Sequence, residues 1–175
     1  MTTYVVVPSH STVGFTVRHA GIGKTRGVFD VFGGEVKIPD EGPWTGATAE
    51  GTIDAASINT RSDARDEHLR GADFFDVEQF PTWVFHTTKV EGGGEDFKVT
   101  GDLTIHGITQ PVVIDVEFLG AATDPFGAER IAFEGKTKIS RKDFGLTWNA
   151  ALEAGGVLVG DKVTINLEIE AVKQA

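Results

Sequence analysis

The sequence predicts an all-β protein, an extended antiparallel barrel of about eight strands with one short helix at an end. Three observations lead to this fold class. Apolar and polar residues alternate with a period of two along most of the chain, glycine-rich turn signals separate the alternating segments, and one charged stretch lacks alternation. The 175 residues show no shift in composition, so we expect a single domain over residues 1–175.

The alternating segments are the predicted strands. In chain order they cover residues 4–7, 13–18, 27–38, 47–56, 83–90, 97–106, 112–118, 130–134 and 163–170. The pattern is weaker in 27–38, 47–56 and 83–90. The turn signals between them lie at residues 33–34, 40–43, 92–94, 106–107, 124–127 and 155–156. Because the connections are short and no helical crossovers occur, neighbouring strands should pair antiparallel. The longer segments favour a tall barrel over a small sandwich.

The segment from residue 59 to residue 75 (NTRSDARDEHLRGADFF) is charged and does not alternate. Thr60 followed three residues later by Asp63 resembles a capping box, and Gly71 is a natural helix end. We therefore expect a helix over residues 62–70.

The predicted helix and the residues after it have an apolar underside, formed by Leu69, Phe74 and Phe75. A short amphipathic segment of this kind can shield one open end of a barrel, so we expect a lid that gates entry. Ion pairs should hold the lid, although the same carboxylates also allow an acid–base pair. The groups concerned are Asp66, Asp73, Asp76, Arg61, Arg65 and Arg70.

The composition excludes several function classes. Asp and Glu number 26 against 16 Lys and Arg, a net charge of −10, which disfavours nucleic acid and broad binding to anionic membranes. Without cysteine there is no disulfide framework or thiolate chemistry. The N-terminal apolar run stops at Pro8 and no long apolar segment follows, so we expect a cytoplasmic protein without stable membrane insertion.

The inward positions of the predicted strands are apolar. An eight-stranded barrel can be packed solid or can hold one small ligand. Alternation alone leaves both interiors open. If a cavity exists, its lining and therefore its ligand should be apolar.

Four motifs, in order and with consistent spacing, carry a resemblance to a known family. They are His10-Ser11-x-Val13-x-Phe15-x-Val17-x-His19 with Gly27-x-Phe29; Ser57-Ile58-Asn59-Thr60 with Arg65-Asp66-x-His68-Leu69-Arg70-x-x-Asp73-Phe74-Phe75-Asp76; Phe80-Pro81 and Phe85 with Gly101-x-Leu103-Thr104-Ile105-His106-Gly107; and Ser140-Arg141-x-Asp143-Phe144-Gly145-Leu146. Over residues 4 to 173 the chain resembles the YceI-like, polyisoprenoid-binding family. Trp83 stands where that family more often has an aliphatic residue, which could narrow a pocket.

The resemblance implies a lipocalin-like barrel that binds, stores or carries an isoprenoid lipid, such as a quinone or polyprenyl phosphate, with a role in transport or stress response. Some relatives carry amide or fatty-chain lipids, and many are periplasmic and have a leader. The resemblance is also compatible with a homodimer. With the inward pattern, the resemblance indicates a pocket formed by Phe15, Val17, Phe29, Leu69, Phe74, Phe75, Trp83, Phe85, Leu103, Ile105, Phe118 and Phe133. The residues indicated for a polar head group are His10, His68 and Arg141.

The sequence gives less support to metal binding and to catalysis. The five histidines lack HExxH spacing, so we expect no metal, and His106 before Gly107 is typical of a turn. Arg141 is expected to clamp a loop through Asp143 or to bind a head group. No catalytic constellation is evident, so we expect no enzyme and no cofactor beyond a bound lipid. The alternatives are an isomerase or hydrolase with a His–carboxylate pair in the pocket, and a structural stress protein with a solid core.

Overall fold

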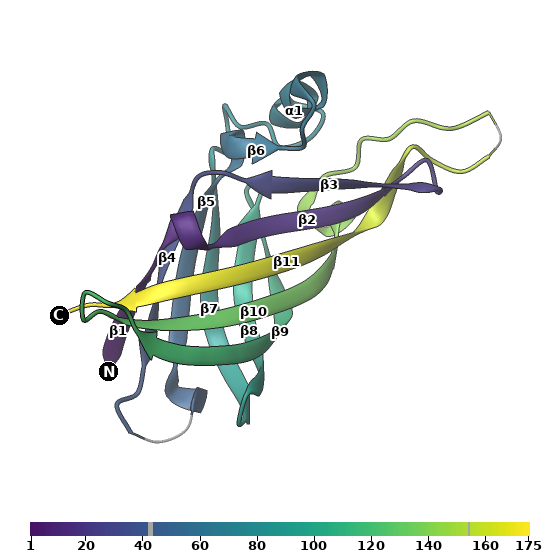
Figure 1. The fold of residues 1–175 in the computed structure, drawn as a ribbon. Coiled ribbons are helices and arrows are strands. Elements are labelled where there is room, and N and C mark those ends of the chain that lie inside the picture. The colour runs from purple at the N-terminus through teal and green to yellow at the C-terminus, as the bar shows by residue number, and fades with distance from the viewer. Residues whose placement is uncertain (42–43, 154) are drawn as a thin grey trace.

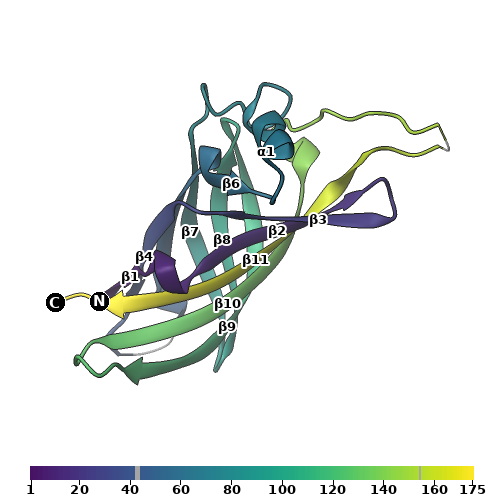
Figure 2. The same ribbon diagram turned by 45° about the horizontal axis from the view of Figure 1, so that its top comes forward.

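The computed structural model describes residues 1–41, 44–153 and 155–175. Long strands wind into a barrel, and α1 lies at one end beside β6 (Figures 1 and 2). In chain order the elements are β1 (Thr2–Val6), η1 (Pro8–His10), β2 (Thr12–His19), β3 (Gly23–Phe29), β4 (Phe32–Ile38), η2 (Trp44–Gly46), β5 (Thr48–Asp54), η3 (Ala55–Ser57), β6 (Ile58–Asn59), α1 (Asp63–Arg70), β7 (Thr82–Gly93), β8 (Asp96–Ile105), β9 (Ile108–Thr123), β10 (Glu129–Ser140), η4 (Arg141–Phe144) and β11 (Val159–Lys173). The η elements are short 3-10 helices.

The strands form a closed antiparallel barrel of eight strands, as predicted. Three pairs of short strands each act as one bent strand of the barrel: β1 with β2, β4 with β3, and β5 with β6. The two members of a pair follow one another along the same neighbour, since β1 and β2 both pair with β11. In the same way β4 and β3 pair with β1 and β2, and β5 and β6 pair with β4 and β3. From β5 the order continues through β7, β8, β9 and β10 to β11. The pairing of β11 with β1 closes the ring.

Each predicted strand region forms β structure, but residues 27–38 divide into β3 and β4, and the turn expected at residues 33–34 was wrong because these residues lie inside β4. The last three strands are longer than predicted. β9, β10 and β11 extend beyond the alternating segments on both sides. Pairing between β10 and β11 runs without interruption from Arg130 to Ser140. Hydrogen bonds to a long neighbouring strand therefore extend these strands beyond the residues that alternate in the sequence.

The helix α1 lies where predicted, but its first turn is capped by a different residue. The Ser62 hydroxyl accepts a hydrogen bond from the Arg65 amide at 3.3 Å, and Gly71 ends the helix as expected. Thr60 is buried, and its hydroxyl and amide donate to the Asp66 carboxylate at 2.5 and 2.9 Å. Thr60 thus joins the helix to β6, and the capping-box prediction is wrong by two residues.

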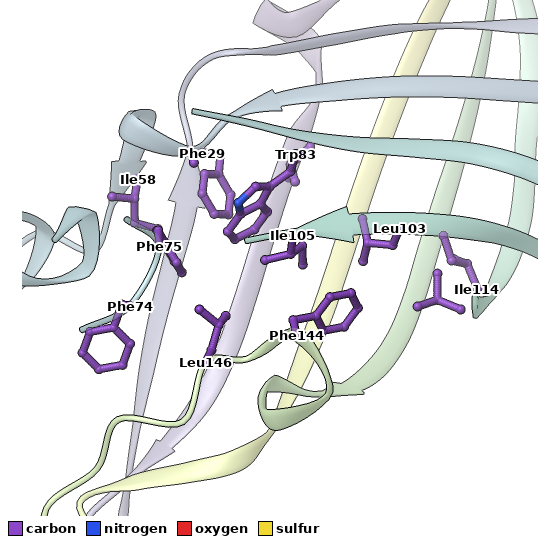
Figure 3. Packing of buried hydrophobic residues seen from close by; sticks show 13 residues of the cluster. Phe29, Ile58, Phe74, Phe75, Trp83, Leu103, Ile105, Ile114, Phe144 and Leu146 are labelled. Carbon is purple, nitrogen blue, oxygen red and sulfur yellow. The ribbon is translucent and has the colours of Figure 1, made fainter. Parts of the chain in front are cut away.

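The two ends of the barrel are filled by different clusters. Near α1 lie the largest fully buried side chains, Ile58, Ile105 and Phe144, and Figure 3 shows Phe29 and Trp83 close to the first two. At the end opposite α1, the Trp44 ring packs against three other aromatic rings at centroid distances of 5.1 to 5.9 Å. These rings belong to Phe97, Phe118 and Phe133. No described helix is long and apolar enough to span a membrane.

Candidate functional site

The space between these two clusters is an internal cavity of about 330 Å³. Its wall includes Phe74 and Phe75 at the helix end and Trp44 at the other, so the cavity follows the long axis of the barrel. Nearly all of its surface is carbon, because each strand turns its apolar positions inward. Alternation alone allowed either a solid core or a cavity, and the described residues form a cavity. The volume lies within the range of small-molecule pockets.

The predicted pocket residues lie on the cavity wall, with one exception. Phe118 is not on the wall and instead packs against Trp44 and Phe133 at 5.1 and 5.5 Å. Phe118 nevertheless lies on the inward face as predicted, because it pairs with Phe133 and alternates in step with Ile114 and Val116, all of which line the cavity. Period-two counting predicts the face of the sheet, but not whether a ring on that face reaches open space. Contact between a ligand and the other predicted pocket residues remains a prediction.

Several wall residues escaped the sequence analysis because they lie outside regular alternation. Trp44 stands in η2 after a turn, and Leu146 follows η4, yet both line the cavity. Phe32 lies directly after the bend between β3 and β4, and it also reaches the wall. A large apolar residue beside a turn signal is the one clue that could have indicated them.

The helix end of the cavity is formed by an aromatic cluster. The Trp83 ring lies 4.8 Å from the rings of both Phe29 and Phe75 in edge-on geometry. Phe74 packs against Trp148 at 5.2 Å, and Leu69 completes this part of the wall. The Trp83 indole N–H is buried and has no hydrogen-bond acceptor among the described residues. It is the one buried side-chain polar atom of this cluster that lacks a partner in the described part of the chain.

Arg141 is a buried loop clamp, and its contacts differ from those predicted. Its guanidinium donates hydrogen bonds of 2.6 to 3.2 Å to four backbone carbonyls, and no bond to the Asp143 side chain occurs among the described residues. The carbonyls belong to Leu146, Trp148, Val159 and Gly160. Burial lowers the pKa of Arg141, and the charge of Asp161 partly opposes this effect. Since Arg141 also borders the cavity, contact with a head group stays a prediction.

The two other predicted head-group residues lie off the cavity wall. His10 lies 3.5 Å from the Glu170 carboxylate on an exposed surface. His68 shares a hydrogen bond of 2.8 Å with Asp73, and its ring packs edge-on against Trp148 at 4.8 Å. His68 therefore sits on the outer side of the lid, and its contact with a ligand head also stays a prediction.

The ion pairs expected between arginines and carboxylates around the helix do not form among the described residues, where both kinds of side chain have other hydrogen-bond partners. Arg65 donates to the hydroxyl and carbonyl of Thr60, and Arg70 donates to the carbonyls of Ala56 and Ile58. The carboxylates instead find other partners: Thr60 for Asp66, His68 for Asp73 and Gln79 for Asp76. Buried carbonyls near a helix end need donors, and an arginine fork supplies several at once.

Three of the five histidines lie beside a carboxylate, with the imidazole on the surface of the barrel. None of the five lines the cavity. His106 occupies the β8–β9 turn with a positive φ of 56°, as predicted, and its ring contacts the Phe144 carbonyl at 3.2 Å. His86 pairs with Glu50 on the exposed surface at 2.9 Å. The described residues contain no group of three or more His, Cys, Asp or Glu that could hold a metal ion.

Comparison with known sequences identifies the family. A YceI-like domain matches residues 4–171. The chain belongs to the YceI-like family. A UPF0312 protein of Staphylococcus aureus (strain bovine RF122 / ET3-1) is 37% identical to this YceI-like chain over 171 residues, 97% of each protein. A UPF0312 protein of Vibrio cholerae serotype O1 (strain ATCC 39541 / Classical Ogawa 395 / O395) is 37% identical over 139 residues, 79% of this chain and 73% of its own.

Solved structures share the barrel of this YceI-like chain. Burkholderia cenocepacia BcnA is 25% identical with a TM-score of 0.81, covering 94% of this chain and 98% of its own. The Campylobacter jejuni YCEI protein is 31% identical with a TM-score of 0.76, covering 90% of each chain. A polyisoprenoid binding domain from Saccharophagus degradans, implicated in plant cell wall breakdown, has a TM-score of 0.68 and covers 96% of this chain and 97% of its own; at 17% identity it supports the fold alone.

Proposed function

We propose that this YceI-like protein binds a long isoprenoid lipid inside its barrel, as a carrier or store and not as an enzyme. The observation that carries the proposal is the apolar cavity of about 330 Å³ that follows the barrel axis. A long hydrocarbon tail matches both its chemistry and its shape. An isoprenoid quinone and a polyprenyl phosphate are the two ligand types that we consider first.

The energetics of apolar burial favour such a ligand. Removing apolar surface from water contributes roughly 25 cal/mol per Å², or about 0.8 kcal/mol for each buried methylene. A tail of several isoprene units can therefore bind without many polar contacts. The net affinity is smaller than this sum because a flexible tail loses conformational entropy when it becomes ordered.

The orientation of the lipid follows from the two ends of the cavity. At the end opposite α1 the Trp44 cluster contains aromatic rings only, which suits the end of a tail. Toward α1 the wall includes Arg141 and Trp83, which carry N–H groups. We place the tail toward Trp44 and the polar head toward α1, where Leu69 of the helix and Phe74 and Phe75 after it form the gate.

Native mass spectrometry of freshly purified protein tests the proposal directly. We expect one bound lipid per chain, and organic extraction followed by fragmentation should release fragments spaced by isoprene units. The control is delipidated protein incubated with vesicles that contain an isoprenoid quinone, which should regain the adduct. Protein that stays free of lipid in both experiments would contradict the proposal.

We also expect no turnover of simple ester, phosphate or quinone substrates above the rate of a protein-free blank. The histidines lie away from the cavity, so no acid–base pair meets a ligand inside it. The measurement is product formation with the wild type beside His10→Ala, His68→Ala and Asp66→Asn. Activity that disappears in one of these variants would show that the protein is an enzyme.

A further inference from the structure

Cations on the strands of the barrel fall into two groups. One group forms ion pairs with carboxylates at N–O distances of 2.7 to 3.6 Å and consists of Lys37, Lys89, Lys98, Arg130 and Lys173. The other group is exposed and takes part in no ion pair among the described residues, although the chain has 26 Asp and Glu against 16 Lys and Arg. We call this second group the cationic face; it consists of Lys136, Lys138, Lys162, Arg18, Lys24 and Arg26.

The strand register brings the cationic face together on the outside of the barrel. Its members lie on four strands that neighbour one another in the order β10, β11, β2 and β3. Residues next to them in the chain, such as Val17, Ile139 and Val163, line the cavity, so the cations point outward. One row of paired residues crosses all four strands and has a cation at each end: Lys138, Thr164, Thr16 and Arg26.

This arrangement is unfavourable for the isolated protein. Arg18 lies directly opposite Lys24 on the neighbouring strand, and like charges in that position repel. Residues 1–29, which include both strands of this hairpin, contain no Asp or Glu. Asp161 adjoins Lys162, but its carboxylate already accepts hydrogen bonds from the Ser140 hydroxyl at 2.6 Å and the Lys142 amide at 3.4 Å. An anionic partner outside the protein would relieve the repulsion.

The turn between β2 and β3 adds an apolar tip to the cationic face. Ile22 is 93% exposed, and its amide donates to the His19 carbonyl at 3.2 Å, which keeps the turn tight. The Ala20 amide donates to the Leu158 carbonyl at 2.7 Å and so ties the turn to the segment before β11. Val157 of that segment is also exposed. Aliphatic side chains beside cations are typical of protein surfaces that bind anionic membranes.

The apolar tip lies at the end of the barrel where we place the gate. In both Figure 1 and Figure 2 the β2–β3 turn and the segment before β11 project beyond the barrel from the end that carries α1. The same segment contacts the lid, because the Trp148 ring packs against Phe74 at 5.2 Å and against His68 at 4.8 Å. A bilayer that touched Ile22 would therefore be close to the gate.

We propose that the cationic face and Ile22 dock the protein peripherally on the surface of an anionic phospholipid bilayer. The choice of a bilayer rests on the proposed lipid binding, because a lipid held in the barrel has to be taken from a membrane. A nucleic acid would match the charge but would leave the aliphatic tip in water. The net charge of −10 repels a bilayer from the rest of the surface, so docking requires this one face to turn toward it.

Co-sedimentation with vesicles that contain no isoprenoid lipid tests the docking. The wild type should bind vesicles of phosphatidylcholine and phosphatidylglycerol more tightly than vesicles of phosphatidylcholine alone, and added salt should weaken this binding. Each cation near an anionic surface is worth about fivefold in the binding constant. Arg18→Gln/Lys24→Gln/Arg26→Gln should therefore lose about tenfold to hundredfold. These side chains are exposed, so the variant should fold like the wild type.

The matched control changes the charge by the same amount elsewhere on the barrel. Lys37→Gln/Lys89→Gln/Lys98→Gln removes three exposed cations that already have carboxylate partners. It should bind the phosphatidylglycerol vesicles within about threefold of the wild type, since these strands face away from the docked bilayer. An equal loss in both triple variants would show that only the net charge matters, and it would overturn the cationic face as the docking site.

A fluorescent label tests the apolar tip in a protein whose charges are intact. Ile22→Cys carries an environment-sensitive dye, and its emission should rise when phosphatidylglycerol vesicles are added. Phe126→Cys is the control: Phe126 is 94% exposed but lies in the β9–β10 turn, at the other end of β10 from the cationic face. A rise at Phe126→Cys without one at Ile22→Cys would overturn the proposed orientation.

The outcomes separate docking from the proposed function. Protein that takes up an isoprenoid quinone but binds both kinds of vesicle equally would overturn the docking and leave lipid binding intact. Protein that docks as expected but never takes up a lipid would contradict the proposed lipid binding instead. Tighter binding of a labelled oligonucleotide than of the phosphatidylglycerol vesicles would make nucleic acid the partner of this face and overturn the bilayer.

Discussion

Replacing Arg141 by Met should lower the free energy of unfolding by about 3–5 kcal/mol. The guanidinium is 4% exposed and satisfies four backbone carbonyls between residues 146 and 160. Met has a similar length but no donor, so these carbonyls would be left without partners, and each buried acceptor without one costs roughly 1–3 kcal/mol. The measurement is a urea or guanidinium melt of the delipidated protein.

Two further variants make this result specific. Lys142→Met changes the neighbouring exposed cation and should alter stability by about 0.5 kcal/mol or less. Arg141→Lys keeps the charge but lacks the planar fork, so it should fall between the wild type and the Met variant. A stability of Arg141→Met equal to that of the wild type would show that the carbonyls have other partners.

The double variant Phe74→Ala/Phe75→Ala should release bound lipid about tenfold faster or more. Both rings are 7% exposed and lie on the cavity wall under α1. Burying one phenylalanine side chain is worth roughly 1.5–3 kcal/mol, and 1.4 kcal/mol corresponds to a tenfold change in an equilibrium constant. Losing both rings removes contacts with the lipid and opens the end through which it would leave. The measurement is the off-rate of a fluorescent lipid.

The stability of this variant distinguishes a gate from ordinary core. Each ring faces open space on one side, so its removal forfeits fewer protein contacts than in a solid core. We therefore expect a loss below the roughly 3–5 kcal/mol that a fully buried Phe→Ala change costs. Phe80→Ala is the matched control: Phe80 packs against His106 at 4.8 Å and does not line the cavity. An unchanged off-rate with large destabilisation would make Phe74 and Phe75 core residues and refute the gate.

Local sequence patterns were enough to predict the strands, the helix and most of the inward-facing residues. Period-two alternation depends on the pleat of a single strand, so it can be recognised without knowing the neighbouring strands. The helix over residues 62–70 followed in the same way from its charged, non-alternating sequence and from Gly71. The family motifs added the lipocalin-like closure, which alternation alone does not specify.

Properties that depend on several strands together required the tertiary structure. Phe118 lies on the inward face, but it contacts Trp44 and Phe133 instead of the open space of the cavity, and this depends on where the tertiary fold places Trp44. The four carbonyls that Arg141 binds come from the segment after η4 and from β11, so no spacing near Arg141 could reveal them.

The same limit applies to Trp44 and Trp83. Trp44 reaches the cavity because η2 lies at the end of the barrel opposite α1, and nothing in its local pattern specifies this position. Alternation correctly placed Trp83 inside, but it could not show that the indole N–H lacks an acceptor. The sequence alone therefore determined which residues of the regular strands face inward. Only the tertiary structure decided which polar groups find partners there, because hydrogen bonds depend on distances between residues remote in the chain.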